Sequence, residues 1–414
     1  MNGNDLKRAL DPYDQALLAQ DFSALSKRVK KRPVVLYFGR ATFSDNTKYL
    51  YLQALAAARS YEVYWCSGHD ELIASLRAQG LPCLHLGEHI DVSIDMLLHA
   101  AVAVFCVNPN ESVRNMATLV PCLDGATKIQ LWHGVSVKRL GLQLISHLGT
   151  RDINLRRPWE FSSRADVVLS TAGHFDGYWR EVFGCRTLLR AGYPRNEVLL
   201  RPASELEMLG AELDEPTRAA LLDPAKRAVL VVPTWQRFQN TFVSEPAFFA
   251  RLLLHARKRG VNLFIKLHPS LALGDTGTHG ERTPGLYLLP AGVDVYPWLR
   301  HFSGLLTDYS SIMFDFLHTG KPVMRLDLPP GEHQNFEPDY ALIPDGEFAH
   351  VFDAANVEAV FDAMLGDDTL AAARQAMCGR LFETPPLLAS EQIERLVERR
   401  VAQAVADDFT VLTV

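Results

Sequence analysis

Short apolar runs alternate with stretches of helical length along most of the chain. In the first half these runs lie at 34–39, 62–66, 83–86, 101–106, 128–132 and 166–170. In the second half they lie at 228–233, 261–267, 286–289, 304–307 and 322–326. Each run has the length of a buried strand. Strands that alternate with helices in this way predict an α/β fold with parallel sheets, covered by helices on both faces.

The chain has 414 residues, which is too long for one ordinary hydrophobic core. Pro194 and the charged segment that follows it indicate a boundary between two Rossmann-like domains. We predict a helical segment at 1–32, a first domain at 33–195, a second domain at 196–385, and a C-terminal helix and tail at 386–414. We expect this last helix to pack back on the first domain.

Composition narrows the class of protein without identifying it. Apolar residues make up 48% and charged residues 22%, as in soluble globular proteins. The net charge of -6 argues against nucleic acid as the main partner. No apolar run has the length of a membrane span, and the N-terminus has no apolar signal core. The six cysteines show no CxxC spacing, which favours reduced core cysteines in a cytoplasmic protein.

A basic cluster precedes the first strand. Five of its six positions are basic, namely Lys27, Arg28, Lys30, Lys31 and Arg32. Near an anionic lipid surface each basic residue contributes about 1 kcal/mol to binding. The cluster therefore predicts peripheral contact with the inner face of a membrane. The alternative is a solvated charged face.

The stretch 304–324 combines a strand, a tight turn, a helix and the start of the next strand. Ser310 and Ser311 fall at the start of the helix, where backbone N–H groups have no partner within the helix. Such a helix start binds anions, because the helix dipole and the hydroxyl donors both favour negative charge. The alternative is that one serine only caps the helix.

Two histidines follow apolar strands. His133 comes just after the run 128–132 and is followed by Gly134, where the backbone can turn sharply. A histidine with an ordinary pKa of about 6.5 suits a general base. Lys266 and His268 are two residues apart, so in a strand they point to the same face. A structural histidine and a surface ion-pair site are the respective alternatives.

These segments resemble one family. Thr307-Asp-Tyr-Ser-Ser-Ile-Met-Phe-Asp-Phe316, followed by Lys321-Pro322, is similar to the C-terminal motif of the CDP-glycerol glycerophosphotransferases. These enzymes build teichoic acids and related capsule polymers. Further matches are Trp132-His-Gly134, Gly192-Tyr-Pro-Arg-Asn196 and Lys266-Leu-His-Pro269, with a weaker one at 43–50. The resemblance covers residues from about 34 to 340.

The chain departs from the family pattern at a few positions. Val135 and Ser136 stand where the family has Thr-Pro, which puts the geometry of that loop in question. Gln236 stands where the family's Pro-Thr-Trp-Arg motif has its arginine, so that Arg237 is displaced by one position. Glu197 replaces the family's aspartate.

The resemblance implies a GT-B-like arrangement, in which the two domains face a cleft and CDP-glycerol binds to the second. A base would take the proton of an acceptor hydroxyl, which attacks the β-phosphorus and displaces CMP. The implied catalytic residues are His133 and His268. The implied donor-binding residues are Thr234, Arg237, Lys266, Thr307, Asp308, Ser310 and Ser311. Acceptor or supporting roles fall to Gly134, Lys138, Arg195 and Asn196.

The implied partners are CDP-glycerol and a polyol-phosphate or saccharide acceptor, lipid-linked at the inner face of the membrane. No acidic cluster has the spacing of a metal site, so we expect no required cofactor, although Mg²⁺ is compatible with the reaction. Three alternatives stay open: another donor such as CDP-ribitol, a sugar-nucleotide glycosyltransferase or epimerase of the same fold, and a non-catalytic nucleotide-binding protein. The sequence does not separate a primase from a polymerase.

Overall fold

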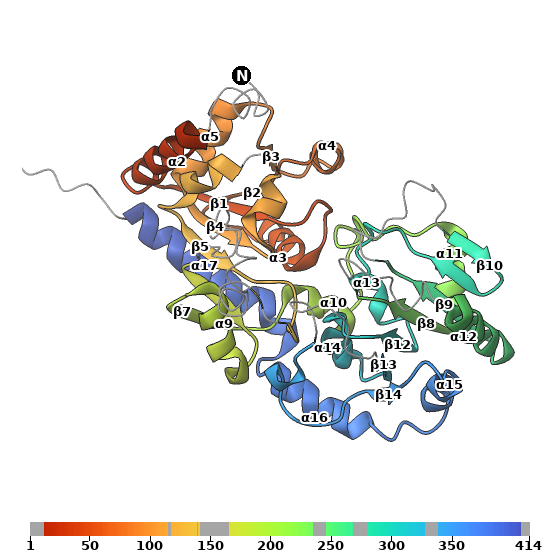
Figure 1. The fold of residues 1–414 in the computed structure, drawn as a ribbon. Coiled ribbons are helices and arrows are strands. Elements are labelled where there is room, and N and C mark those ends of the chain that lie inside the picture. Colours follow the sequence, from red (N-terminus) through yellow and green to blue (C-terminus); the bar gives the residue numbers. More distant parts are fainter. Residues whose placement is uncertain are drawn as a thin grey trace, which may run out of the picture. The chain divides into compact units, whose positions relative to one another are not determined.

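A computed structural model describes residues 12–114, 117–138, 140, 165–234, 246–267, 280–327 and 338–406 (Figure 1). The chain forms two compact units. Unit 1 consists of Met1–His133, Leu140–Arg195 and Thr384–Val414, and unit 2 of Gly134–Arg139 and Asn196–Glu383. One of the places where the chain passes between the units lies between Arg195 and Asn196. The domain bounds given above stay a prediction. Gly134–Arg139 groups with unit 2, although the sequence analysis places it in the first domain.

Unit 1 contains a seven-stranded sheet with the order β3-β2-β1-β4-β5-β6-β7, in which every neighbouring pair is parallel. The strands are β1 (Arg32–Phe38), β2 (Glu62–Ser67), β3 (Cys83–His85), β4 (Ala100–Phe105), β5 (Thr127–Gln130), β6 (Val167–Ser170) and β7 (Thr187–Arg190). Its helices include α2 (Pro12–Ser26), α3 (Asp45–Ala56), α4 (Asp70–Ala78), α5 (Ile90–His99), α6 (Pro109–Val113), α9 (Asp176–Phe183) and α17 (Ala389–Ala406). Short 3-10 turns lie at Ala117–Leu123, Gly173–Phe175 and Pro386–Leu388.

The C-terminal helix α17 packs on β1, β4 and α3 of unit 1. Its buried Glu394 accepts hydrogen bonds from the hydroxyls of Tyr37 at 3.1 Å and Tyr61 at 2.5 Å. These two bonds supply partners that a buried carboxyl group needs. The prediction that the last helix packs back on the first domain is confirmed (Figure 1).

Unit 2 contains a second seven-stranded sheet, with the order β10-β11-β9-β8-β12-β13-β14. The strands are β8 (Arg227–Val232), β9 (Val261–Ile265), β10 (Gly280–Thr283), β11 (Leu286–Leu288), β12 (Gly304–Thr307), β13 (Val323–Leu326) and β14 (His350–Phe352). Its helices include α10 (Glu197–Leu200), α11 (Glu215–Leu222), α12 (Pro246–Lys258), α13 (Tyr296–Leu299), α14 (Ile312–Phe316), α15 (Glu358–Leu365) and α16 (Ala371–Leu381). Short 3-10 turns lie at Leu317–Thr319 and Tyr340–Leu342, and a third, Pro194–Asn196, spans the boundary between the two units.

Each apolar run that predicted a strand forms one, with ends that agree within two residues. The α/β fold with two sheets is therefore confirmed. The prediction of wholly parallel sheets is wrong at one edge, because β10 pairs antiparallel with β11. The sequence of β10, Gly-Glu-Arg-Thr, is polar because the strand lies at the sheet edge. The cleft expected between the two domains stays a prediction.

The residues of the basic cluster before β1 differ in their exposure to solvent. Lys31 is buried, and its Nζ donates to the carbonyl oxygen of Leu98 at 2.6 Å and to Ser26 Oγ at 3.4 Å. Burial lowers the pKa of Lys31 to about 8. Arg32 forms a two-bond ion pair with Asp95. The prediction that Lys31 faces a membrane is therefore wrong, since burial keeps its ammonium from any lipid surface.

The other three basic residues of the cluster, Lys27, Arg28 and Lys30, are exposed. In the parts of the chain that the structure describes, no helix is both long enough and apolar enough to span a membrane. Contact between the cluster and a membrane surface stays a prediction for these three side chains and for the exposed Arg32.

Candidate active site

The candidate base lies at the carboxyl edge of the sheet in unit 1. Arg40 follows β1, Cys106 follows β4 and His133 follows β5, and these three strands are neighbours in the sheet. The backbone turns sharply around the histidine, since Trp132 has a φ of 58° and Gly134 a φ of 134°. A positive φ is costly for tryptophan and persists only where surrounding contacts hold it. The turn directs His133 beyond the end of its strand.

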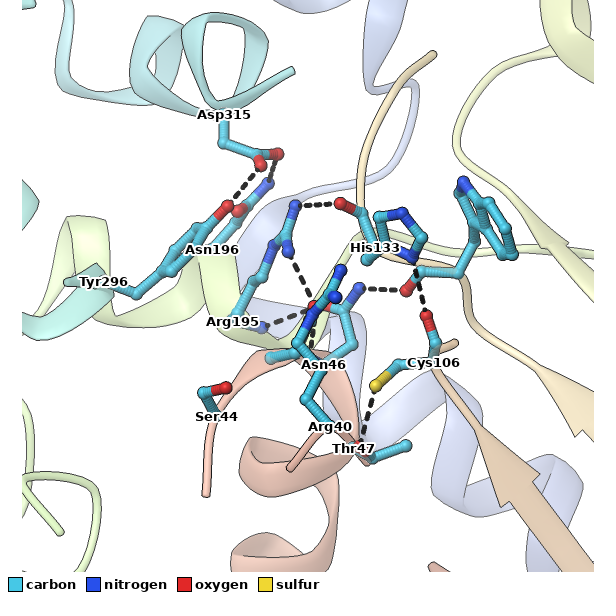
Figure 2. A network of polar contacts seen from close by, with 12 residues as sticks. Arg40, Ser44, Asn46, Thr47, Cys106, His133, Arg195, Asn196, Tyr296 and Asp315 are labelled. Carbon is cyan, nitrogen blue, oxygen red and sulfur yellow. Dashed lines mark hydrogen bonds and ion pairs between the residues drawn. The ribbon is translucent and has the colours of Figure 1, made fainter. Parts of the chain in front are cut away.

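The ring of His133 is held on one nitrogen. Its Nδ1 lies 3.0 Å from the carbonyl oxygen of Cys106, which can only accept a hydrogen bond (Figure 2). Nδ1 therefore carries the proton, and Nε2 has a free lone pair. The indole of Trp132 stacks on the imidazole, with ring centres 4.1 Å apart.

His133 is also kept neutral. Burial lowers its pKa to about 3, and the guanidinium of Arg40 acts in the same direction. A neutral ring with an unprotonated Nε2 is the form that a general base requires. At physiological pH the ring is therefore neutral and its Nε2 can accept a proton, but burial also makes it a weaker base than a histidine with the ordinary pKa of about 6.5.

Asp45, the first residue of α3, connects two arginines beside this ring. Its Oδ1 accepts a hydrogen bond from Arg195 Nη1 at 2.7 Å, and its Oδ2 accepts one from Arg40 Nε at 3.0 Å. The side chains of Asp45 and Arg195 are only 5% and 4% exposed. Burial opposes ionisation of this carboxyl group, but Arg195 and Arg40 outweigh it and lower its pKa. Asp45 is thus a buried carboxylate whose charge is paired.

The same residues hold the backbone on which His133 sits. Arg195 Nη2 donates to the carbonyl oxygen of His133 at 2.8 Å, and Asn46 Nδ2 donates to that of Trp132 at 2.7 Å (Figure 2). The structure therefore brings together two of the sequence-predicted site residues, His133 and Arg195. Gly134 follows directly and provides the positive φ that ends the turn.

In unit 2, three predicted donor-binding residues meet at the carboxyl ends of β8 and β12. Asp308 accepts hydrogen bonds from the hydroxyl of Thr234 and from the backbone N–H of Thr234, the latter at 3.0 Å. Thr307 Oγ1 donates to the carbonyl oxygen of Val232 at 2.6 Å. All three side chains are buried, and burial raises the pKa of Asp308. These hydrogen bonds hold the loop that leads into α14.

Ser310 and Ser311 lie between β12 and α14, and both are partly exposed. The carbonyl oxygen of Ser310 accepts from Met313 N, and that of Ser311 accepts from Phe314 N, each at 3.1 Å. Ser311 occupies the N-cap position, yet within the described residues its hydroxyl makes no capping hydrogen bond. The capping alternative therefore lacks the bond that defines it.

Lys138 belongs to the segment Gly134–Arg139, which groups with unit 2. Its Nζ lies 5.0 Å from the centre of the Tyr309 ring. The carbonyl oxygen of the preceding residue, Val137, accepts a hydrogen bond from Asp339 N at 2.7 Å. Burial lowers the pKa of Lys138, and the carboxyl group of Asp308 opposes this effect. A predicted acceptor or supporting residue thus lies beside the loop that carries Ser310 and Ser311.

Two further predicted residues have clear surroundings. Lys266 directly follows β9, and its Nζ donates to the carbonyl oxygen of Ala291 at 2.9 Å. Asn196 Nδ2 donates to Asp315 Oδ1 at 3.0 Å, and the hydroxyl of Tyr296 donates to Asp315 Oδ2 at 2.7 Å (Figure 2). Because Asp315 belongs to α14, Asn196 contacts the helix that begins after the two serines.

The remaining predicted residues, His268 and Arg237, lie outside the described residues. In the ranges that are described, no group of three or more His, Cys, Asp or Glu side chains is placed to hold a metal ion. The expectations that no cofactor is required and that Mg²⁺ is compatible with the reaction stay predictions.

Sequence reasoning missed five residues of these networks: Arg40, Asp45, Asn46, Tyr296 and Asp315. The signal for the first three was the polar stretch that follows β1 at the carboxyl end of a central strand and runs into the first residues of α3. Such loops carry functional residues in parallel α/β sheets. The loop also overlaps the weak family match at 43–50. Tyr296 gave no local signal. Asp315 lies within the quoted motif 307–316, but its pairing with Tyr296 depends on the tertiary structure.

Two α/β units, each with polar groups at the carboxyl ends of central strands, define a GT-B-like protein. Residues 20–328 match the model of the family CDP-glycerol:poly(glycerophosphate) glycerophosphotransferase. This match covers well over half of the chain, and the chain therefore belongs to that family.

Individual relatives are more distant. The teichoic acid poly(glycerol phosphate) polymerase of Bacillus subtilis (strain 168) is 24% identical over 313 residues, covering 73% of this chain and 40% of that protein. The matches to the curated relatives cover between 27% and 58% of the length of those proteins.

Solved structures show the same fold. The wall teichoic acid polymerase TagF superimposes with a TM-score of 0.67 at 19% identity, covering 94% of each chain. The spinosyn forosaminyltransferase SpnP superimposes with a TM-score of 0.51 at 15% identity, covering 90% of this chain and 99% of that one. At these identities the likeness is one of fold.

Proposed function

We propose that the protein transfers glycerol phosphate from CDP-glycerol to a hydroxyl group of an acceptor, releasing CMP. The observation that carries the proposal is the family match at 20–328, which spans every candidate site residue from His133 to Ser311. The name of the family states the donor, CDP-glycerol, and a poly(glycerophosphate) acceptor. The geometry around His133 supports the proposal independently, because it provides a neutral base with an unprotonated Nε2.

The proposed reaction has one bond-forming step. His133 Nε2 takes the proton from the acceptor hydroxyl, and the oxygen attacks the β-phosphorus of CDP-glycerol. The bond from this phosphorus to the CMP oxygen breaks, CMP leaves, and a phosphodiester remains. Phosphoryl transfer depends mainly on positioning and on charge stabilisation, so the protein needs a placed base and a placed set of donors.

The donor diphosphate is assigned to the turn before α14. The partly exposed hydroxyls of Ser310 and Ser311 and the N–H groups at the helix start favour an anion there. The ammonium of Lys138, close to Tyr309 in the same loop, adds positive charge. Thr307, Asp308 and Thr234 support the turn through the bonds among them and the neighbouring backbone. In this assignment Lys266 contributes a further cation.

The proposed acceptor is the growing end of a teichoic-acid-like or capsule polymer, lipid-linked at the membrane. The names of relatives support this acceptor class, since they include a teichoic acid polymerase and a glycerol-phosphate primase. The exposed Lys27, Arg28 and Lys30 are the residues that we assign to an anionic membrane surface. Localisation is then cytoplasmic and peripheral.

The test is a donor panel with the purified protein. CMP release is measured from CDP-glycerol and CDP-ribitol, and UDP release from a UDP-sugar, each with and without a glycerol-phosphate-primed lipid. We expect acceptor-dependent CMP release from CDP-glycerol. CMP release from CDP-ribitol alone would mean that CDP-ribitol, and not CDP-glycerol, is the donor. UDP release from the UDP-sugar would favour a glycosyltransferase. Binding of CDP without any release would overturn the enzymatic proposal.

A further inference from the structure

We infer that Asp45 is a positioning residue for His133, acting through Arg195 and Asn46. The inference rests on the proposed function of His133 as the base. It goes beyond that function because it assigns a role to a carboxylate that does not touch the imidazole through any recorded bond. Asp45 is a buried carboxylate bonded to Arg195 and Asn46. The side chains of these two residues bond in turn to the backbone of Trp132 and His133.

Both carboxylate oxygens of Asp45 accept short hydrogen bonds. Oδ1 accepts from Arg195 Nη1 at 2.7 Å and from the backbone N–H of Asn46 at 2.8 Å. Oδ2 accepts from Arg40 Nε at 3.0 Å. Hydrogen bonds between ionised groups are the strong ones, and the low exposure of this pair protects them from solvent. Asp45 thereby holds the guanidinium of Arg195 and the backbone N–H of Asn46.

The side chains of Arg195 and Asn46 bond to two consecutive peptide groups, those of His133 and Trp132. Arg195 Nη2 donates to the carbonyl oxygen of His133 at 2.8 Å, and Asn46 Nδ2 donates to that of Trp132 at 2.7 Å. Arg195 N also donates to Asn46 Oδ1 at 3.4 Å. Two successive carbonyls are thus held at once, which fixes the peptide plane between them.

Both ends of the connection have an unusual backbone. Asp45 has a φ of 72° and Trp132 a φ of 58°, values that residues other than glycine rarely adopt. Such conformations persist where surrounding contacts determine them, and they gather at functional sites. The bond from Asn46 to Trp132 lies between these two positions and is the contact that we expect to maintain the turn.

The consequence for catalysis follows from the remaining bond of the ring. Nδ1 reaches the carbonyl oxygen of Cys106 at 3.0 Å only while the backbone of His133 stays in place. A small rotation of the peptide breaks this bond and releases the proton to either nitrogen. Asp45 therefore determines, through two intermediaries, that Nε2 is the nitrogen without a proton.

The first test reads the tautomer directly. Protein labelled with ¹⁵N-histidine is studied by NMR, and the His133 signal is assigned by its loss in His133→Ala. We expect the wild type to show protonation at Nδ1, and Asp45→Asn and Asn46→Ala to show a mixture of the two tautomers. Should Asp45→Asn fail to fold, Asn46→Ala serves as the test, because this variant keeps the ion pairs of Asp45 with Arg195 and Arg40. A pure Nδ1–H form in Asn46→Ala would overturn the inference.

The second test separates turnover from donor binding. A displacement of a reacting group by about 1 Å costs about 100-fold in rate, so we expect Asp45→Asn to lower kcat by about 10- to 100-fold. We expect the KM for CDP-glycerol to stay unchanged. The matched control is Asp95→Asn, which removes the partner of Arg32 from an exposed ion pair of the same unit.

The control variant should leave both constants unchanged. A normal kcat in Asp45→Asn, or a fall equal to that in Asp95→Asn, would contradict the inference. If the wild type releases no CMP, the proposed function fails, whereas the NMR spectrum still decides the positioning role.

Discussion

Lys138 Nζ lies 5.0 Å from the centre of the Tyr309 ring, so a cation stands beside the loop that carries Ser310 and Ser311. If it neutralises the donor diphosphate, Lys138→Ala should weaken binding of CDP by about 10- to 100-fold, the value of one hydrogen bond to a charged group. Titration calorimetry measures this affinity. Lys226→Ala, at an exposed position of the same unit, is the control. Equal affinities of the two variants would remove Lys138 from the donor site.

The two serines make a separate prediction. Their hydroxyls are partly exposed, and that of Ser311 makes no capping bond within the described residues. The double variant Ser310→Ala, Ser311→Ala should therefore bind CDP-glycerol more weakly while its melting temperature stays close to that of the wild type. A lower melting temperature with unchanged donor affinity would mean that the pair only stabilises α14.

The contact between Tyr296 and Asp315 predicts a loss of stability. The Tyr296 hydroxyl donates to a fully buried carboxyl group at 2.7 Å. Tyr296→Phe leaves that oxygen without this donor, which costs about 1–3 kcal/mol in the free energy of unfolding. Urea denaturation measures this difference. Tyr64→Phe, whose hydroxyl bonds to exposed Glu62, should cost much less, and equal losses would be inconsistent with a special role for the buried contact.

The low pKa of His133 predicts a pH effect with a definite sign. Burial keeps the ring neutral down to about pH 3, whereas an unfolded histidine takes up a proton near pH 6.5. The unfolded state therefore binds more protons between these values, and stability is lost as the pH falls from about 6.5 toward 3. In His133→Asn this contribution is absent.

The comparison is made by urea denaturation across that pH range. The difference in unfolding free energy between wild type and His133→Asn should shrink as the pH is lowered. A difference that stays constant would show that the folded-state pKa of His133 is close to its ordinary value.

The sequence predicted eleven of the strands well because these are short apolar runs that are buried in a sheet. It failed where burial and charge are decided by tertiary contacts. Lys31 reads as one of five basic surface residues, yet it is buried and bonded to Leu98. The polar edge strand β10 carries no apolar run, so its antiparallel pairing gave no signal.

The candidate site divides in the same way. His133 follows a buried strand directly, and a sequence motif is enough to find it. Asp45 and Arg195 are separated by 150 positions, and only the fold shows that they form an ion pair. Arg195 was found through its motif, whereas Asp45 lies among several polar residues in a weak family match at 43–50, which does not single it out.

The central claim is that His133 is the base of a glycerophosphotransfer reaction, and single-turnover CMP release from CDP-glycerol tests it most directly. With a glycerol-phosphate-primed lipid present, His133→Ala should release CMP about 100-fold or more slowly than the wild type, the usual effect of losing a general base. Its affinity for CDP-glycerol should be nearly unchanged. His174→Ala, at an exposed histidine of the same unit, should behave as the wild type does. CMP release at the wild-type rate by His133→Ala would contradict the account.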